Sequence, residues 1–106
     1  NQIQVGHNVR IGAHTAMAGC VAVAGSTRIG SYCLIGGGAG FVGHIEVGDR
    51  VTVTARSLVT HSIAGPGEYS SGTPLQPTRK WRRNAARFKQ LDELARKIAN
   101  LPPAED

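Results

Sequence analysis

The chain has 106 residues, which is enough for one small domain. Aromatic residues make up only 5% of it and glycine occurs 14 times, so a conventional aromatic-rich core is excluded and a stacked, repetitive architecture is indicated. No apolar run approaches about 18 residues, which excludes a transmembrane helix. The net charge of +5 is uneven, because eight of the 12 Lys and Arg residues fall between positions 79 and 97.

Residues 5–59 repeat with a period of six. Every sixth residue is apolar: Val5, Ile11, Met17, Val23, Ile29, Ile35, Phe41, Val47, Val53 and Val59. The second position of each hexad is mostly Gly, Ala or Thr, and the fifth is small or β-branched, as far as Ser57 and Ile63. A helix with 3.6 residues per turn cannot use this period, whereas the two-residue alternation of a strand fits it. We therefore predict short strands with an inward first position, and a small second position that lets the backbone turn tightly.

Three such hexads close a triangular coil, and successive coils stack about 4.8 Å apart. Residues eighteen apart in the sequence then lie above one another. The arrangement resembles the left-handed parallel β-helix of hexapeptide-repeat proteins, and only this resemblance supplies the handedness. The predicted fold is all-β with an α-helical tail, and the β-helix covers residues 1–63. Because the repeat is already under way at residue 1, we expect the chain to be a fragment of a longer protein.

The remaining residues divide into three predicted segments. Residues 64–77 are rich in Gly and Pro and are predicted as an exit loop that cannot continue the coil. Residues 78–101 are predicted as an amphipathic, basic helical tail that Thr78 caps. A break near Asp92 would divide this tail into two helices. Its apolar stripe comprises Trp81, Ala85, Phe88, Leu91, Leu94 or Ala95, Ile98 and Leu101. Pro102 and Pro103 end the helix, and 102–106 are predicted to be disordered.

Four histidines occupy corner positions that face mostly outward. His14 and His61 are interpreted as solvated surface residues. His7 and His44 differ, because they are 37 residues apart and therefore share one edge of the prism, two coils from each other. Gly25 follows His7 by eighteen residues, and Gly43 follows Gly25 by eighteen.

This edge offers the groups that acyl transfer to an amine requires. Histidine is a base in the neutral range and can take the proton of the amine. A backbone N–H that no side chain covers can donate a hydrogen bond to the developing oxyanion. His7 and Gly25 are the candidates for these two roles.

Several stretches extend this interpretation: "QIQVGHNVRIG", "TAMAG", "VAGSTRIGSYCLIGG", "GHIEVGDRVTVTA", and "PGEYSSGTPLQP" with "WRR" soon after. Together they resemble the C-terminal part of the UDP-3-O-acylglucosamine N-acyltransferases of the lipid A pathway. The resemblance implies that His7 is the catalytic base, His44 a second active-site histidine, and Gly25 the oxyanion-hole glycine. Asn8 and Gly43 are expected to contact substrate in the cleft. The carboxylate that orients the base in this family would precede residue 1.

The resemblance also implies substrates and partners. The donor is a 3-hydroxyacyl thioester on the phosphopantetheine of acyl carrier protein, with no other cofactor and no metal. The acceptor is the 2-amine of a UDP-linked glucosamine, whose uridine is bound by an N-terminal domain outside this chain. The family is homotrimeric, with its active sites in clefts between neighbouring β-helices. We expect a cytoplasmic location in a Gram-negative bacterium.

Two sets of residues have open interpretations. Arg79, Lys80, Arg82 and Arg83 form either a solvated helix face or a docking surface for the acidic carrier protein. Nucleic acid fits less well, because the available aromatic residues, Trp81 and Phe88, belong to the apolar stripe. Candidates for an acyl-chain groove are Met17, Leu34 and Leu58. Met17 fits the core better because it occupies an inward position.

The sequence leaves three alternatives open. A zinc lyase of the γ-carbonic-anhydrase type needs three converging imidazoles, and no second histidine follows His44 closely. Another hexapeptide acyltransferase would use CoA thioesters, or would acylate a hydroxyl as the related enzyme of the same pathway does. The third alternative is a structural or binding β-helix without catalysis.

Overall fold

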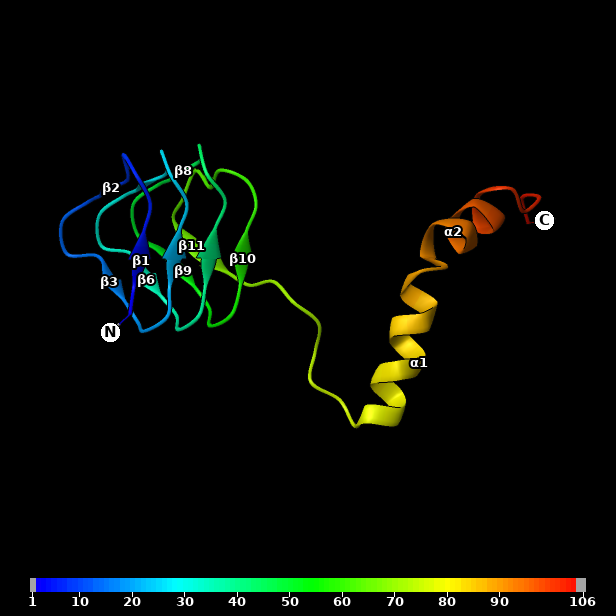
Figure 1. Cartoon of the computed structure of the whole chain (residues 1–106). Helices are drawn as coiled ribbons and strands as arrows, with labels where there is room; N and C mark the ends of the chain where they lie inside the picture. The colour runs from blue at the N-terminus through cyan, green and yellow to red at the C-terminus, as the bar shows by residue number, and fades with distance from the viewer. Residues whose placement is uncertain (1, 105–106) are drawn as a thin grey trace. The chain divides into compact units, whose positions relative to one another are not determined.

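The structure is a computed structural model that describes residues 2–104. It divides into two compact units, one ending at Gly72 and the other beginning at Thr73. The first unit is a β-helix and the second is helical (Figure 1). We describe each unit by itself.

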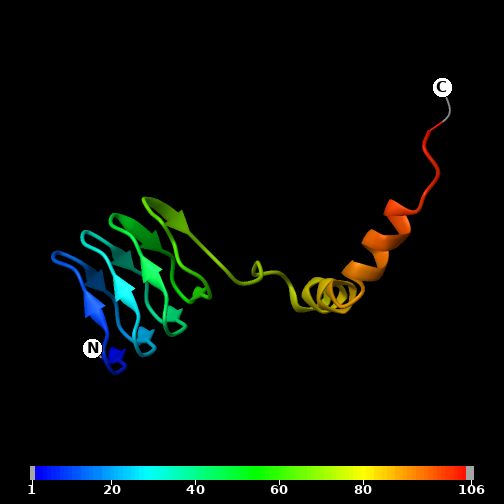
Figure 2. The same ribbon diagram turned by 90° about the horizontal axis from the view of Figure 1, so that it is seen from above.

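Three parallel sheets form the faces of the β-helix. Sheet A contains β1 (Gln4–Val5), β4 (Ala22–Val23), β7 (Gly40–Phe41) and β10 (Leu58–Val59). Sheet B contains β2 (Arg10–Ile11), β5 (Arg28–Ile29) and β8 (Glu46–Val47). Sheet C contains β3 (Ala16–Met17), β6 (Leu34–Ile35), β9 (Val51–Val53) and β11 (Gly67–Tyr69). Figure 2 shows these strands stacked coil upon coil, and the predicted left-handed parallel β-helix is confirmed.

The predicted register of eighteen residues is confirmed over the first coils. Val5 pairs with Val23, and Val23 pairs with Phe41, on successive strands of sheet A. The first-position side chains from Val23 to Val59 are buried, and fifth-position residues such as Val21, Cys33 and Val51 fill the same core. Since each coil buries its apolar residues against the next, the core is a continuous column through the prism.

The tight turn of each corner lies at the fourth hexad position. Every sixth residue from Asn8 to Arg56 is in the left-handed region, with φ between 59° and 63° at the non-glycine residues and 70° at Gly38. Hydrogen bonds between coils hold this conformation, as where Ser26 N–H donates to the His7 carbonyl oxygen and Tyr32 N–H donates to that of Ala13. The prediction that the second position provides the tight turn is therefore wrong.

The second position is small because the next coil lies against it. A Cβ on Gly12 would lie 2.7 Å from the backbone N of Ser31, and one on Gly36 would lie 2.4 Å from the backbone N of Ala55. Such distances are too short for a side chain. Glycine at these positions therefore provides space between coils.

The register changes in the last coil. Ile63 pairs with Val47, sixteen residues earlier, and its N–H donates to the Glu46 carbonyl oxygen. The corner after β10 is therefore two residues shorter than the corners below it. Ile63 was predicted at the fifth position, but it takes an inward position beside Val47 and is buried. Because Ile63 fills the core two residues earlier than the repeat requires, the residues after it no longer follow the eighteen-residue register.

The segment 64–77 differs from the predicted exit loop. β11 lies within it and pairs in parallel with β9, with Glu68 opposite Thr52. The Thr54 N–H also donates to the Tyr69 carbonyl oxygen. Gly65 and Gly67 have positive φ values, so glycine allows the chain to return to sheet C despite the turn-forming sequence.

The second unit contains helices α1 (Thr78–Phe88) and α2 (Leu91–Ala99). The break falls at residues 89–90, close to the predicted one near Asp92. The predicted cap is wrong: Pro77 occupies the N-cap position and Thr78 is the first helical residue. Residues 102–104 have no helix or strand, and residues 105–106 of the segment predicted to be disordered lie outside the described part. Neither helix is long and apolar enough to cross a membrane.

Candidate active site

One corner of the β-helix, which we call the histidine corner, joins sheet A to sheet B on every coil. It consists of residues 6–9, 24–27, 42–45 and 60–62. The third positions of its first three coils hold His7, Gly25 and Gly43. His44 follows at the fourth position of the third coil. The structure therefore brings the predicted base, glycine and second histidine to one edge of the prism.

Gly25 lies directly above His7. A Cβ on Gly25 would stand 3.1 Å from the His7 carbonyl oxygen, and that oxygen accepts a hydrogen bond of 2.9 Å from the neighbouring Ser26 N–H. The His7 side chain is exposed. Histidine and glycine thus lie one strand spacing apart, roughly 4.8 Å, on an accessible corner.

The N–H of Gly25 is available to a ligand. Among residues 2–104, no group accepts a hydrogen bond from it. The equivalent N–H on the next corner, that of Ser31, donates 2.8 Å to a carboxylate oxygen of Asp49, eighteen residues on. A third-position N–H can therefore bind an oxyanion placed above it. On the histidine corner, the residue equivalent to Asp49 is Gly43. Because glycine has no side chain, the space above the Gly25 N–H is left open.

His44 is two coils above His7, roughly 10 Å along the axis, so the two imidazoles cannot touch. The His44 N–H donates 3.1 Å to the Gly25 carbonyl oxygen, and the His44 side chain is exposed. Asn8, also exposed, occupies the same fourth position two coils below His44. Because His44 lies two coils from His7, only a substrate that spans several coils would contact both histidines.

The histidine corner separates two depressions. On the sheet A side, a trough of about 430 Å³ runs past Ala22 and Gly40 to Leu58, and reaches the residues that precede His7, Gly25 and Gly43. On the sheet B side, an open depression of about 900 Å³ is lined by residues that include Arg10, Arg28, His44 and Glu46. The first depression is mainly apolar in its residues and the second carries charge.

Comparison with known proteins places this geometry in context. No family model matches the chain. The chain is 56% identical over 101 residues to a UDP-3-O-acylglucosamine N-acyltransferase of Hahella chejuensis, covering 95% of this chain and 29% of that protein. It is 56% identical over 101 residues to the enzyme of the same name from Pseudomonas fluorescens, with the same coverage. The enzyme of that name from Pseudomonas syringae pv. syringae is 55% identical over 104 residues, which cover 98% of this chain and 30% of the relative.

The predicted resemblance is confirmed. The chain matches one segment of the UDP-3-O-acylglucosamine N-acyltransferases along almost its whole length. It spans about 30% of the length of these curated relatives.

The segment shared with the N-acyltransferases includes three candidate groove residues that the structure places apart. Leu58 lies on sheet A, at the end of the trough beside the histidine corner. Leu34 lies on sheet C, which does not adjoin this corner, although both leucines are more than half exposed. Met17 is partly buried against the core, in keeping with its inward position.

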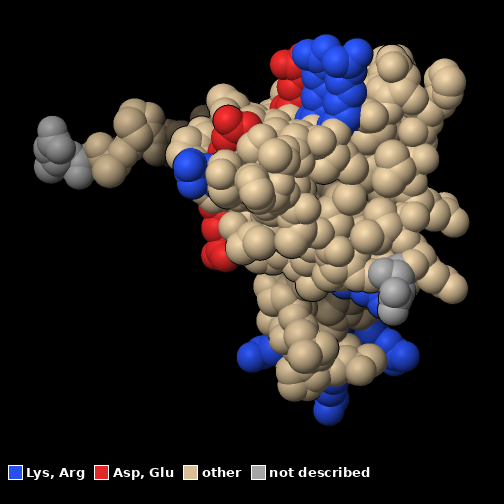
Figure 3. Space-filling view, turned by 90° about the vertical axis from the view of Figure 1, so that its left-hand side faces the viewer, with Lys and Arg blue, Asp and Glu red and all other residues tan. Residues whose placement is uncertain are grey.

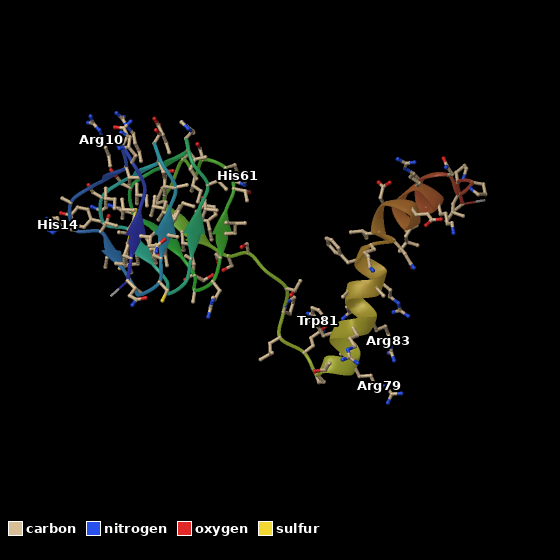
Figure 4. The ribbon with its side chains drawn as sticks, viewed as in Figure 1. Arg10, His14, His61, Arg79, Trp81 and Arg83 are labelled. Carbon is tan, nitrogen blue, oxygen red and sulfur yellow. The ribbon has the colours of Figure 1, made fainter. Side chains whose placement is uncertain are left out.

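The other two histidines are not neighbours of His7 and Gly25. His14 occupies a fourth position on the corner between sheets B and C, where its ring stacks on Tyr32 with centroids 5.0 Å apart. Arg50 lies over the same tyrosine ring, 4.7 Å from its centroid. His61 lies on the histidine corner in the last coil, and its ring nitrogen Nδ1 is 3.0 Å from the Ser62 carbonyl oxygen. Both side chains are exposed, as predicted (Figure 4).

The four predicted docking residues lie together on the N-terminal half of α1. Arg79, Lys80, Arg82 and Arg83 are all exposed, and no acidic residue lies in the first turn of the helix. Figure 4 shows Trp81 on the side of α1 facing the preceding loop, with Arg79 and Arg83 pointing away from it. Trp81 and Phe88 line a cavity of about 410 Å³ with Pro74 and Gln76.

Two features of the site were missed by sequence reasoning. Ser26 bridges Gly25 to His7 through its backbone N–H. Arg10 and Arg28 pair in register on sheet B, in the same depression as His44. Their separation of eighteen residues was the signal that would have found them. Among residues 2–104, no group of three His, Cys, Asp or Glu side chains lies close enough to hold a metal ion.

Proposed function

We propose that this chain carries the catalytic base and oxyanion hole of an N-acyltransferase that acylates the 2-amine of UDP-3-O-acyl-glucosamine. The main support is that exposed His7 lies directly beneath Gly25, whose N–H has no partner within residues 2–104. The names of the relatives supply the class of reaction and the acceptor. The donor is a 3-hydroxyacyl group on acyl carrier protein, in the cytoplasm of a Gram-negative bacterium.

The reaction proceeds by addition and elimination at the thioester carbonyl. The acceptor amine attacks the carbonyl carbon while His7 takes a proton from the amine nitrogen. The carbonyl oxygen becomes negatively charged and accepts a hydrogen bond from the Gly25 N–H. Collapse of the intermediate breaks the carbon–sulfur bond, and the proton on His7 passes to the leaving thiolate. The products are the amide and the free phosphopantetheine thiol, and His7 returns to its neutral form.

The trough on sheet A receives the acyl chain. Ala22 and Gly40 provide a smooth floor, and Leu58 stands at one end, where the Gly40 Cβ position lies 3.4 Å from its Cδ1 atom. Burial of methylene groups there contributes about 0.8 kcal/mol each. Leu34, on another sheet, reaches a substrate only if a neighbouring β-helix presents it to the cleft. Asn8, Gly43 and His44 lie on the same corner and contact the substrate in the cleft.

Association of three chains completes the site. A single prism has shallow depressions, and a second prism beside the histidine corner would enclose them. The second unit also exposes a large apolar surface: Trp81, Phe88, Leu91, Leu94, Ile98 and Leu101 are each at least 44% exposed. Contiguous apolar surfaces of this kind mark protein interfaces. A homotrimer in which these helices pack together would cover them.

The basic surface of α1 docks the acidic carrier protein. Four of its first six residues are Arg or Lys, and two of them, Arg79 and Arg83, point away from Trp81 of the apolar stripe (Figure 4). Complementary charge accelerates encounter and orients the partner.

The deciding experiment is an assay of the full-length protein with a 3-hydroxyacyl carrier-protein donor and UDP-3-O-acyl-glucosamine. We expect amide formation with this donor at a much higher kcat/KM than with the corresponding CoA thioester. Equal turnover of both thioesters would favour a CoA-dependent acyltransferase. Acylation of a hydroxyl in place of the amine would contradict the proposed reaction.

A further inference from the structure

The sheet B depression contains two arginines without a partner of opposite charge. Arg10 and Arg28 are neighbours in register on β2 and β5, and Glu46 follows on β8. All three side chains are exposed. Within residues 2–104, neither arginine has a carboxylate oxygen within 4.0 Å. The ion pair found in this part of the chain joins Arg96 to Asp92, both on α2. Figure 3 shows basic side chains gathered at the top of the β-helix, with acidic side chains beside them.

The Cα atoms of Arg10 and Arg28 are paired in register on adjacent strands, so when both side chains extend from the sheet their guanidinium groups repel each other unless an anion lies between them. Side chains on the outer face of a parallel sheet point the same way when they are in register. Arginine presents a planar set of N–H donors that matches phosphate oxygens in pairs. Two such groups side by side therefore fit a phosphate or diphosphate better than a single carboxylate.

The position of the pair relates it to the histidine corner. Arg10 follows Asn8 by two residues, and both arginines line the depression that His44 borders. The apolar trough lies on the opposite side of the same corner. A substrate reacting at His7 and Gly25 can thus place its hydrocarbon on sheet A and its charged part on sheet B.

From this geometry, we propose that Arg10 and Arg28 bind a phosphate-type anion of the substrate, beside the reacting groups. Under the proposed function, two substrate groups have this chemistry: the diphosphate of the nucleotide acceptor and the phosphodiester of the donor's phosphopantetheine. Assignment to a substrate rests on the proposed function, whereas anion binding by the two arginines does not depend on catalysis. Glu46 is the register neighbour of Arg28 on β8 and disfavours an anion on that side, so the anion is expected between Arg10 and Arg28.

The test begins with binding of inorganic pyrophosphate to the full-length protein, measured by calorimetry at low salt. We compare the wild type with the double variant R10Q/R28Q, and with R56Q as a control. Arg56 is an exposed arginine on the corner between sheets C and A, so R56Q removes a similar charge away from the depression. We expect R10Q/R28Q to weaken binding by roughly tenfold or more and R56Q to change it by less than about twofold. R10K/R28K, which keeps charge but loses paired donors, should bind with intermediate affinity.

Equal affinity of R10Q/R28Q and the wild type would overturn the proposal, as would an equal loss in R56Q. Circular dichroism of the variants checks that the β-helix is intact. Steady-state kinetics then identify the source of the anion. A raised KM for the nucleotide acceptor points to its diphosphate, and a raised KM for the carrier-protein donor points to its phosphodiester; no change in either KM would contradict a substrate role.

The two proposals fail in different ways. If His7→Ala retained full acyl transfer, the proposed base would be wrong, yet the pyrophosphate measurements would still be decisive for the arginines. If R10Q/R28Q bound pyrophosphate normally while His7→Ala lost activity, only the anion site would be wrong.

Discussion

Gly25 lies directly above His7 on one corner of the β-helix, with its Cβ position 3.1 Å from the His7 carbonyl oxygen. This relationship places His7, the proposed base, one coil below an N–H that has no hydrogen-bond acceptor within residues 2–104. It depends on the regular stacking of coils, because the third-position carbonyl oxygens from His7 to Gly37 each accept a hydrogen bond from a fourth-position N–H on the coil above, as His7 does from Ser26. A change of register in the first two coils would separate the two groups.

Replacement of Gly25 by alanine should reduce acyl transfer without unfolding the protein. The new methyl group would crowd the His7 carbonyl oxygen, so the local backbone must shift by a few tenths of an ångström and move the N–H relative to the base. Misplacement of an oxyanion donor on this scale should lower kcat by roughly tenfold to a hundredfold. Gly37→Ala is the matched control, because Gly37 occupies the same hexad position on another corner and its Cβ would meet only ordinary contacts at 3.6 Å. Equal kcat values for both variants would argue against an oxyanion role for Gly25.

Replacement of Gly36 by alanine should destabilise the β-helix, even though the adjacent Gly37→Ala should not. The Cβ of residue 36 would lie 2.4 Å from the backbone N of Ala55, and backbone cannot move aside as a side chain can. Overpacking of this kind costs about 1–3 kcal/mol of unfolding free energy. Chemical denaturation of the two variants measures the difference. Similar midpoints would show that the spacing between coils is not what requires glycine at the second position.

Replacement of Leu58 by alanine should shift donor preference towards longer acyl chains. Leu58 stands at the end of the sheet A trough, so its truncation extends the space available to hydrocarbon. Each additional buried methylene contributes about 0.8 kcal/mol, which corresponds to roughly fourfold in kcat/KM. Leu34→Ala removes a similarly exposed leucine from sheet C and should leave the preference unchanged. A series of thioesters of increasing length provides the measurement; an identical optimum in Leu58→Ala and the wild type would exclude Leu58 from the groove end.

Charge reversal on α1 should weaken recognition of the carrier protein. The double variant R82E/R83E should raise the KM for the carrier-protein donor by roughly tenfold at low salt, since like charges then meet at the interface. The effect should shrink as salt is added. R96E/K97E reverses two charges on α2 and serves as the control. If both variants raise this KM equally, the basic tail acts through net charge and not through a specific surface.

The sequence predicted most of the fold because its period is a direct physical consequence of the architecture. Inward residues such as Val23 and Val53 recur at the spacing that stacked coils impose. The change at Ile63 escaped prediction because an apolar residue two positions early fits either register. The return of β11 to sheet C was also missed, since Gly65 and Gly67 read as loop formers although their positive φ values allow the strand to pair.

The candidate site was predictable where residues share an edge, and less so where they share a face. The spacing correctly predicted that His7, Gly25 and His44 share one edge, whereas their catalytic roles stay predictions. Leu34 and Leu58 have the same hexad position but lie on sheets C and A. Only counting hexads through each three-sided coil distinguishes their faces. Prediction of the Arg10–Arg28 pair would have required the same assignment of hexads to faces. Position within a hexad predicts inward or outward direction, whereas position within a full coil decides which side chains meet.

The most direct test of the account is the rate of acyl transfer by the full-length His7→Ala variant, with carrier-protein donor and nucleotide acceptor both saturating. His14→Ala is the control, because His14 is an exposed histidine on a different corner. If His7 is the base, its replacement lowers kcat by at least about a hundredfold while His14→Ala keeps the wild-type rate. A His7→Ala enzyme that is folded and turns over at the wild-type rate would contradict the account.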